Sequence, residues 1–231
     1  MLLPIENFPS ITIFPTTRRV FALTPPDPII LHQKQQKTMS GSQFTIFGSK
    51  YTMGSYILFI RISSSIQLAF GRFQQSRLFS IPEGNYLYIG SALGRTGDPL
   101  ARRLIRHASR SSGKQPHNIQ AAIIKLFSKN DAALNSAFSA TKKKLHWHID
   151  YLLEHREAEI THIVIVRHPE QMEHHLSEFL ASLSDTSLVA PRLGAQDTRN
   201  SSHILRITDQ HRILQQLGQY IPVLTATHDE E

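Results

Sequence analysis

The stretch "NYLYIGSALGRTGDPLARRLIRH", residues 85–107, puts tyrosines a few positions before a cluster of arginines. From Arg95 to Lys144 there are eleven Lys or Arg side chains, against only Asp98 and Asp131. Guanidinium groups are planar and permanently charged, and they match the oxygens of a phosphate, while a phenol hydroxyl can donate or accept a hydrogen bond. This combination indicates a site for an anionic partner, which for a basic protein is most often nucleic acid.

A second set of side chains that could do chemistry lies in "HWHID". His146, His148 and Asp150 alternate in the sequence, so an extended segment would align all three on one face. Two imidazoles and a carboxylate can bind a transition metal, and they can equally brace a loop through hydrogen bonds. Asp197 and His203 could join either arrangement.

Composition limits the chemistry and the surroundings. The 231 residues include no cysteine, which excludes disulfides, thiolate zinc sites and a cysteine nucleophile. The formal net charge of +7 agrees with an anionic partner. No apolar run is long enough to cross a bilayer and no secretory signal opens the chain, so we expect a cytoplasmic protein without a membrane partner.

The elements that must position these residues follow from the residue pattern. "GSYILFIRI", "SSSIQLAFGRF" and "NYLYIG" have the aromatic and β-branched content of strands and predict an antiparallel meander. "DPLARRLIRHASR" predicts a helix with Asp98 as its cap and Pro99 in its first turn. Later segments predict a helix-containing insertion, a helix start or a short strand-to-helix passage at "HWHIDYLLEH", and a buried strand at "THIVIVRH". They also predict a helix in "PEQMEHHLSEFLASL", a weak strand at "SHILRIT" and a final helix near "QHRILQQLGQY".

Three parts of the chain are expected. Residues 1–50 are rich in Pro, Thr and Gln and predict a loosely ordered extension. Because Met39 and Met53 are both plausible alternative starts, this extension is a candidate start-site artefact. Residues 53–207 form the main domain, and residues 208–231 form a C-terminal helix and tail.

Four motifs of this chain resemble the GIY-YIG nuclease superfamily. They are "GSY" at residues 54–56, with Ser55 in place of the usual Ile; "YIG" at residues 88–90; Leu-x-x-Arg-Leu at residues 100–104; and a helix that carries Glu178. The strings "YIGSALG", "RLIRH", "HWHIDYLLEH" and "GAQDTRNSSHILRI" are similar to a poorly characterised GIY-YIG-like branch known mainly as a domain of unknown function.

The resemblance implies an α+β fold, a small antiparallel sheet flanked by helices, and a Mg²⁺- or Mn²⁺-dependent endonuclease that acts on DNA in repair or processing. Arg103 would clamp the phosphate, Glu178 would hold the metal, Tyr56 and Tyr88 would orient or deprotonate water, and His107 would contact phosphate or shuttle a proton. Residues in or around the arginine cluster would contact nucleic acid: Gly90, which would let the chain turn sharply and approach a phosphate, with Ser91, Arg95, Arg102, Arg106 and Arg110.

Two alternatives stay open. The scaffold and its basic helix can bind nucleic acid without cutting it, in which case only the basic residues matter. A third class is a scaffold that recruits another repair protein through its terminal segments.

Overall fold

A six-stranded sheet forms the centre of the computed structural model, which describes residues 42–128, 143–190, 193 and 203–229. The strand order is β1-β6-β2-β5-β8-β7. The strands are β1 (Phe44–Phe47), β2 (Gly54–Ile62), β5 (Gly84–Ala92), β6 (Ala158–Arg167), β7 (Thr186–Leu188) and β8 (Ile204–Ile207). Only β1 and β6 pair in parallel; the other neighbours are antiparallel. The expected α+β fold, with a mainly antiparallel sheet, is confirmed.

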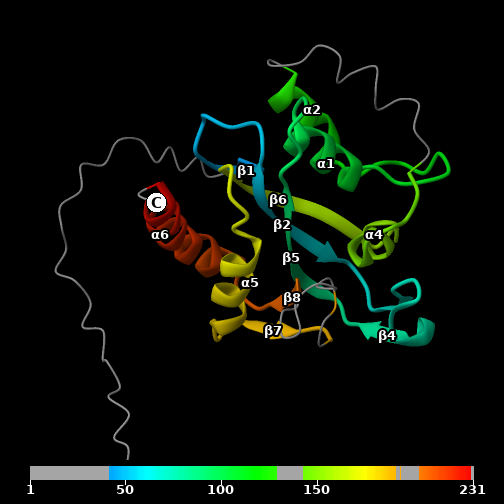
Figure 1. Ribbon diagram of the computed structural model, residues 1–231. Coiled ribbons are helices and arrows are strands. Elements are labelled where there is room, and N and C mark those ends of the chain that lie inside the picture. The colour runs from blue at the N-terminus through cyan, green and yellow to red at the C-terminus, as the bar shows by residue number, and fades with distance from the viewer. Residues whose placement is uncertain (1–41, 129–142, 191–192, 194–202, 230–231) are drawn as a thin grey trace, which may run out of the picture. The chain divides into compact units, whose positions relative to one another are not determined.

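Helices cover both faces of this sheet (Figure 1). On one face lie α1 (Pro99–Ala108), α2 (Gln120–Phe127) and α4 (His148–Leu153); on the other lie α5 (Glu173–Ser182) and α6 (Gln210–Asp229). Along β2, Leu58 and Ile60 pack in the core under α1 and α4, whereas Ile57 and Phe59 pack in the core under α5 and α6. Because both of its faces are buried, β2 is apolar almost throughout.

The predicted meander is wrong in its middle strand. β3 (Ile66–Ala69) leaves the main sheet and pairs with β4 (Leu78–Ile81), a strand that the sequence pattern did not single out. β2 and β5 therefore pair directly with each other, and Tyr56 lies opposite Gly90 in their register. This register matters for the site, because it brings the two tyrosine motifs together.

The N-terminal and C-terminal boundaries also differ from expectation. Residues 1–41 lie outside the described residues, but β1 falls inside the predicted extension and forms an edge of the main sheet. At the other end, α6 packs Ile213, Leu217 and Ile221 into the core that it shares with α5. The C-terminal helix thus belongs to the same core as the sheet. In the described part of the chain, no helix is both long and apolar enough to cross a membrane.

The predicted helix after β5 is confirmed, with its cap. Asp98 accepts a hydrogen bond from the backbone N–H of Ala101 at 2.8 Å, and Pro99 begins α1. Leu100, Leu104 and His107 are all buried, as their spacing predicts. Arg110 lies beyond the end of α1, so the helix carries three of the four arginines assigned to it.

Candidate active site

Tyr56 and Gly90 fit each other across the β2–β5 pair. A Cβ atom at position 90 would lie 2.5 Å from the Tyr56 hydroxyl oxygen and 2.7 Å from its ring carbon Cζ. Only glycine leaves room for this ring. Gly90 is buried within β5, so the sharp turn that we expected there is wrong.

The Tyr56 hydroxyl meets His107 of α1. Tyr56 Oη lies 2.8 Å from Nε2 of His107, and both side chains are buried. Burial raises the pKa of Tyr56 well above its ordinary value and lowers the pKa of His107 well below its own. Both groups are therefore neutral near pH 7. Since Asp150 Oδ1 lies 3.8 Å from Nδ1 of His107, its charge favours the imidazole proton on Nδ1, which leaves Nε2 to accept from the phenol.

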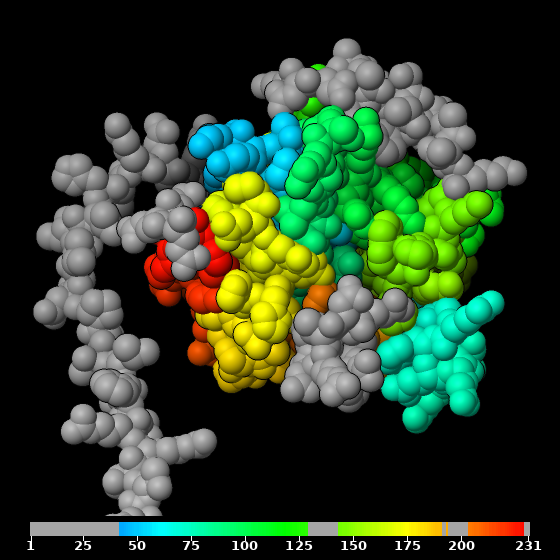
Figure 2. Space-filling view, in the orientation of Figure 1, coloured from blue at the N-terminus to red at the C-terminus, as the bar shows by residue number. Residues whose placement is uncertain are grey.

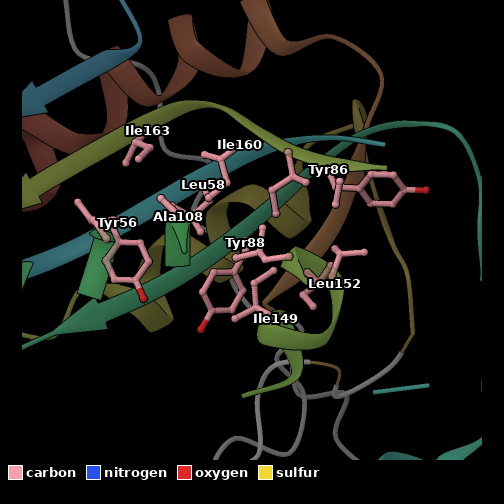
Figure 3. Close-up of a cluster of buried hydrophobic side chains, with 14 of the residues drawn as sticks. Tyr56, Leu58, Tyr86, Tyr88, Ala108, Ile149, Leu152, Ile160 and Ile163 are labelled. Carbon is pink, nitrogen blue, oxygen red and sulfur yellow. The ribbon is translucent and has the colours of Figure 1, made fainter. Parts of the chain in front are cut away.

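Tyr88 extends this polar chain toward the surface. Its ring lies 6.3 Å from that of Tyr56 and 5.7 Å from that of His107, measured between centroids. Tyr88 is 7% exposed and Tyr56 is 1% exposed, so Tyr88 is the less deeply buried of the two. Figure 3 shows both hydroxyls pointing to the same side of the sheet, while Tyr86 points away along β5, where it donates to the Pro82 carbonyl oxygen.

Burial also raises the pKa of Tyr88. The negative charge of Glu173 raises it further, and the positive charge of Arg103 acts in the opposite direction. The same two charges act on Tyr56. Arg103 of α1 and Glu173 of α5 thus lie close enough to both phenols to influence their ionisation.

Glu173, rather than Glu178, is the acidic residue beside the tyrosines. Its carboxylate accepts a hydrogen bond from Ser91 Oγ at 2.5 Å, and His203 Nδ1 lies 2.7 Å from its other oxygen. Burial acts to raise the pKa of Glu173, but the contacts with His203 and Ser91 outweigh it, so this pKa is lowered. The carboxylate is charged at neutral pH.

Glu178 lies one turn and a half further along α5. Its side chain is 65% exposed and lies 3.4 Å from His174, on the part of the helix that faces Tyr220 of α6. The structure therefore does not bring Glu178 together with Tyr56, Tyr88 and Arg103.

In Figure 2 both α5, in yellow, and the segment around α1, in green, reach the visible face of the molecule.

Ser55 of β2 contacts the backbone at the start of α5. Its buried hydroxyl accepts a hydrogen bond from the backbone N–H of Met172 at 3.2 Å, immediately before Glu173. Ser55 thus makes a polar contact between β2 and the residue before α5.

Some arginines of this region are exposed, and others are hydrogen-bonded to groups of the protein itself. Arg95 and Arg102 are exposed. Arg106 makes two hydrogen bonds with the Asp150 carboxylate, and Arg110 donates to the carbonyl oxygens of Leu153, Gln115 and Ala158. The side chain of Arg110 is only 8% exposed, so its position favours an internal structural role over contact with a large ligand.

Arg103 lies against an aromatic ring that the sequence did not mark as functional. Its guanidinium carbon is 4.0 Å from the centroid of the Trp147 ring, and that of Arg106 is 4.3 Å away. The sequence could not predict this contact, because Trp147 follows Arg103 by 44 positions and Arg106 by 41 positions in the chain.

The second predicted polar site does not form as expected. His148 begins α4, so residues 146–150 are not extended and their side chains are not aligned. The His148 ring packs on Phe73 at 4.8 Å, Asp150 turns toward Arg106, and His203 joins Glu173 instead. Asp197 lies outside the described residues. Within the described ranges, no three His, Asp or Glu side chains are arranged to hold a metal.

The fold and the site together define an α+β protein whose sheet and helices gather two phenols, an imidazole, a guanidinium and a carboxylate. A family model, "Domain of unknown function DUF123", matches residues 55–226, and the chain belongs to that family. The match begins in β2 and ends in α6, so it spans both helical layers. No curated protein and no solved structure matches the chain.

Proposed function

We propose that this protein is a divalent-metal-dependent endonuclease of GIY-YIG type that hydrolyses phosphodiester bonds in DNA, in repair or processing. The observation that carries the proposal is the convergence of Tyr56, Tyr88, Arg103, His107 and Glu173 from β2, β5, α1 and α5. These residues supply the groups that phosphodiester hydrolysis needs: a phosphate clamp, a proton acceptor and a charged carboxylate.

Arg103 supplies the phosphate clamp. A guanidinium forms two parallel hydrogen bonds with phosphate oxygens, and it stays charged when it lies against an aromatic ring. Tyr88 is the phenol nearer to solvent, so its hydroxyl is the one that meets the attacking water or the phosphate.

His107 supplies the proton acceptor. As water attacks phosphorus, its proton passes to Tyr88, the Tyr88 proton to Tyr56 and the Tyr56 proton to Nε2 of His107. The bond from phosphorus to the leaving ester oxygen breaks in the same step, and that oxygen takes a proton from solvent. The imidazolium that forms is stabilised by the Asp150 carboxylate 3.8 Å from Nδ1. A neutral phenol with a raised pKa is a poor base by itself, and the bond to His107 gives it an acceptor.

Glu173 is the residue that would hold Mg²⁺ or Mn²⁺. Both hard cations bind to one or two carboxylates and keep several waters, and the ionised Glu173 carboxylate with the Ser91 hydroxyl beside it fits this donor chemistry. Such an ion, when bound, neutralises charge on the phosphate oxygens.

A second candidate function is nucleic-acid binding without cleavage. It is favoured by the burial of Tyr56 and Tyr88, which are 1% and 7% exposed and both protonated near neutral pH. Under this function the exposed Arg95 and Arg102 would account for affinity, with a steep dependence on salt.

The test is cleavage of labelled single-stranded, duplex, flapped and branched DNA in Mg²⁺, in Mn²⁺ and with chelator, by wild type and Arg103→Ala. Metal-dependent cutting that Arg103→Ala loses while it still binds DNA supports the nuclease. Salt-dependent binding without cutting on any substrate favours the binding protein. If DNA is neither bound nor cut, both proposals fail.

A further inference from the structure

Trp147 is the only tryptophan of the chain, and it is half-buried at the edge of the candidate active site. The guanidinium groups of Arg103 and Arg106 lie 4.0 and 4.3 Å from its ring centroid, and the His107 ring lies 6.1 Å away. A cation over an indole face is attracted by the negative charge of the ring, and tryptophan is the best aromatic partner for this contact. The ring therefore restricts where the Arg103 guanidinium can lie.

One carboxylate fixes the backbone that carries the Trp147 ring. Asp150 Oδ2 accepts hydrogen bonds from the backbone N–H groups of His146 and Trp147, just before the first residue of α4, at 2.9 and 3.0 Å. The Arg106 guanidinium donates one hydrogen bond to each Asp150 oxygen, at 2.7 and 2.9 Å, and a further one to the Lys144 carbonyl oxygen. The Asp150 side chain is fully buried, so these contacts are shielded from water.

The same carboxylate faces the catalytic imidazole. Asp150 Oδ1 lies 3.8 Å from Nδ1 of His107, a buried nitrogen without a hydrogen bond in the described part of the chain. Burial acts to raise the pKa of Asp150, but Arg106 and the two backbone N–H groups outweigh it, so this pKa is lowered and the group is charged. A charge at this position orients the imidazole without touching the substrate.

Stability alone is a weak reason for this arrangement. A buried ion pair recovers little more than the cost of removing its charges from water, and apolar residues of similar size are often at least as stable. The Asp150 contacts instead lead to two different functional groups, Arg103 by way of Trp147 and Tyr56 by way of His107.

We propose that Asp150 is a positioning residue that orients two parts of the site, the Arg103 guanidinium and the Tyr56–His107 pair. It fixes Trp147 as the platform on which Arg103 lies, and it keeps the His107 proton on Nδ1 so that Nε2 accepts from Tyr56. The inference rests on the proposed function in one respect, namely that Arg103 and the Tyr56–His107 pair act on a phosphodiester. The "HWHID" string is thereby a device for orienting the site and not a set of metal ligands.

The experiment compares Asp150→Asn with Glu154→Gln. Glu154 ends the same helix, its side chain is 10% exposed, and it accepts bonds from Ser111 and Lys114, away from Trp147. Both variants lose a bonded carboxylate charge, so both lower the thermal unfolding midpoint. Only Asp150→Asn should move Trp147 emission to longer wavelength and increase its quenching by acrylamide. It should also lower kcat on labelled DNA by about 10²-fold with KM nearly unchanged.

Arg106→Lys is the second variant, for the case that Asp150→Asn does not fold. It keeps the charge and the Asp150 backbone contacts but loses the two-pronged bond, so we expect a smaller shift of emission and a smaller fall in kcat. If the folded Asp150 or Arg106 variant matches Glu154→Gln in emission, quenching and kcat, the inference is overturned. If wild type does not cut DNA, the proposed function fails, and Trp147 emission and quenching alone decide whether Asp150 positions the platform.

Discussion

At the scale of single residues, the contact between Gly90 and Tyr56 is the tightest constraint in the site. The Tyr56 ring is held between β5 and α1, with its hydroxyl bonded to His107. A methyl group at position 90 has no space unless this ring moves. The glycine of the second motif is therefore required by packing against the tyrosine of the first.

Gly90→Ala should lower the free energy of unfolding by about 1–3 kcal/mol, because overpacking a dense core forces side chains from their preferred positions. It should also weaken cleavage by displacing Tyr56 from His107. Urea unfolding and the cleavage assay measure the two effects. Gly94→Ala is the control, since a Cβ there meets only Pro99 at 3.5 Å, an ordinary contact distance. Equal stability losses in the two variants would contradict this account.

The motifs that carry the family resemblance singled out Tyr56, Tyr88 and Arg103, and His107 followed because it lies one helical turn after Arg103. Residue types alone would not have selected them. The start of α1 was predictable because its cap is a local signal. Glu173 was missed because the sequence does not reveal that α5 begins at residue 173 rather than at Pro169. At that start the backbone N–H of Met172 bonds to Ser55, 117 positions away in the chain, and no local pattern reports such a contact.

At the scale of elements, α1 carries the largest share of the site and has a cap that fixes its first turn. Asp98 is 3% exposed and bonds to Ala101, so we expect the orientation of Arg103 and His107 further along this helix to depend on it. The sequence predicted this cap because Asp-Pro at a helix start is a local signal. The sequence also predicted a helix start or a short passage from strand to helix in "HWHIDYLLEH", and α4 confirms the helix start. It did not show that the helix begins already at His148, which removes the alignment expected for residues 146–150.

Asp98→Ala should cost about 0.5–2 kcal/mol of stability through loss of the cap, and it should also reduce cleavage by the folded protein. The matched control is Asp209→Ala. Asp209 bonds to the backbone N–H of Arg212 at 3.0 Å in the first turn of α6, on the opposite face of the sheet. We expect a similar shift in the unfolding midpoint and no loss of specific activity. An equal loss of activity in both variants would refute a specific role for the α1 cap.

At the scale of the whole molecule, the sheet separates two cores and buries several histidines in their neutral form. Burial is the main cause of the lowered pKa of His107, His117, His148 and His162, and these residues are spread over the region between β5 and β6 and over β6 itself. The same architecture gathers four separate elements at one site, which the sequence could not show because strand order depends on contacts far apart in the chain.

Acidification should therefore weaken the fold before its carboxylates titrate. Below the ordinary histidine pKa of 6.5 the unfolded chain gains protons that the folded chain does not, so the free energy of unfolding falls. Each such histidine contributes a slope of about 1.4 kcal/mol per pH unit until its folded pKa is reached. Asp150 and Glu173 have lowered pKa values, so their contributions are present above their ordinary values of 3.8 and 4.5 and are lost as pH falls further.

Urea unfolding of wild type from about pH 7.5 to about pH 5 checks this slope. His107→Gln removes one of these histidines, so the slope should fall by about 1.4 kcal/mol per pH unit. A free energy of unfolding that does not change across this range would contradict the burial of these groups as neutral side chains.

The central claim is that Glu173 completes the site with Tyr88 and Arg103. The most direct measurement is the cleavage rate of labelled DNA in Mg²⁺ or Mn²⁺ by wild type, Glu173→Gln and Glu178→Gln, two identical changes five positions apart on one helix. We predict that Glu173→Gln abolishes cutting while it still binds DNA, and that Glu178→Gln, which alters an exposed side chain, cuts like wild type. Cutting that survives in Glu173→Gln and is lost in Glu178→Gln would contradict the account.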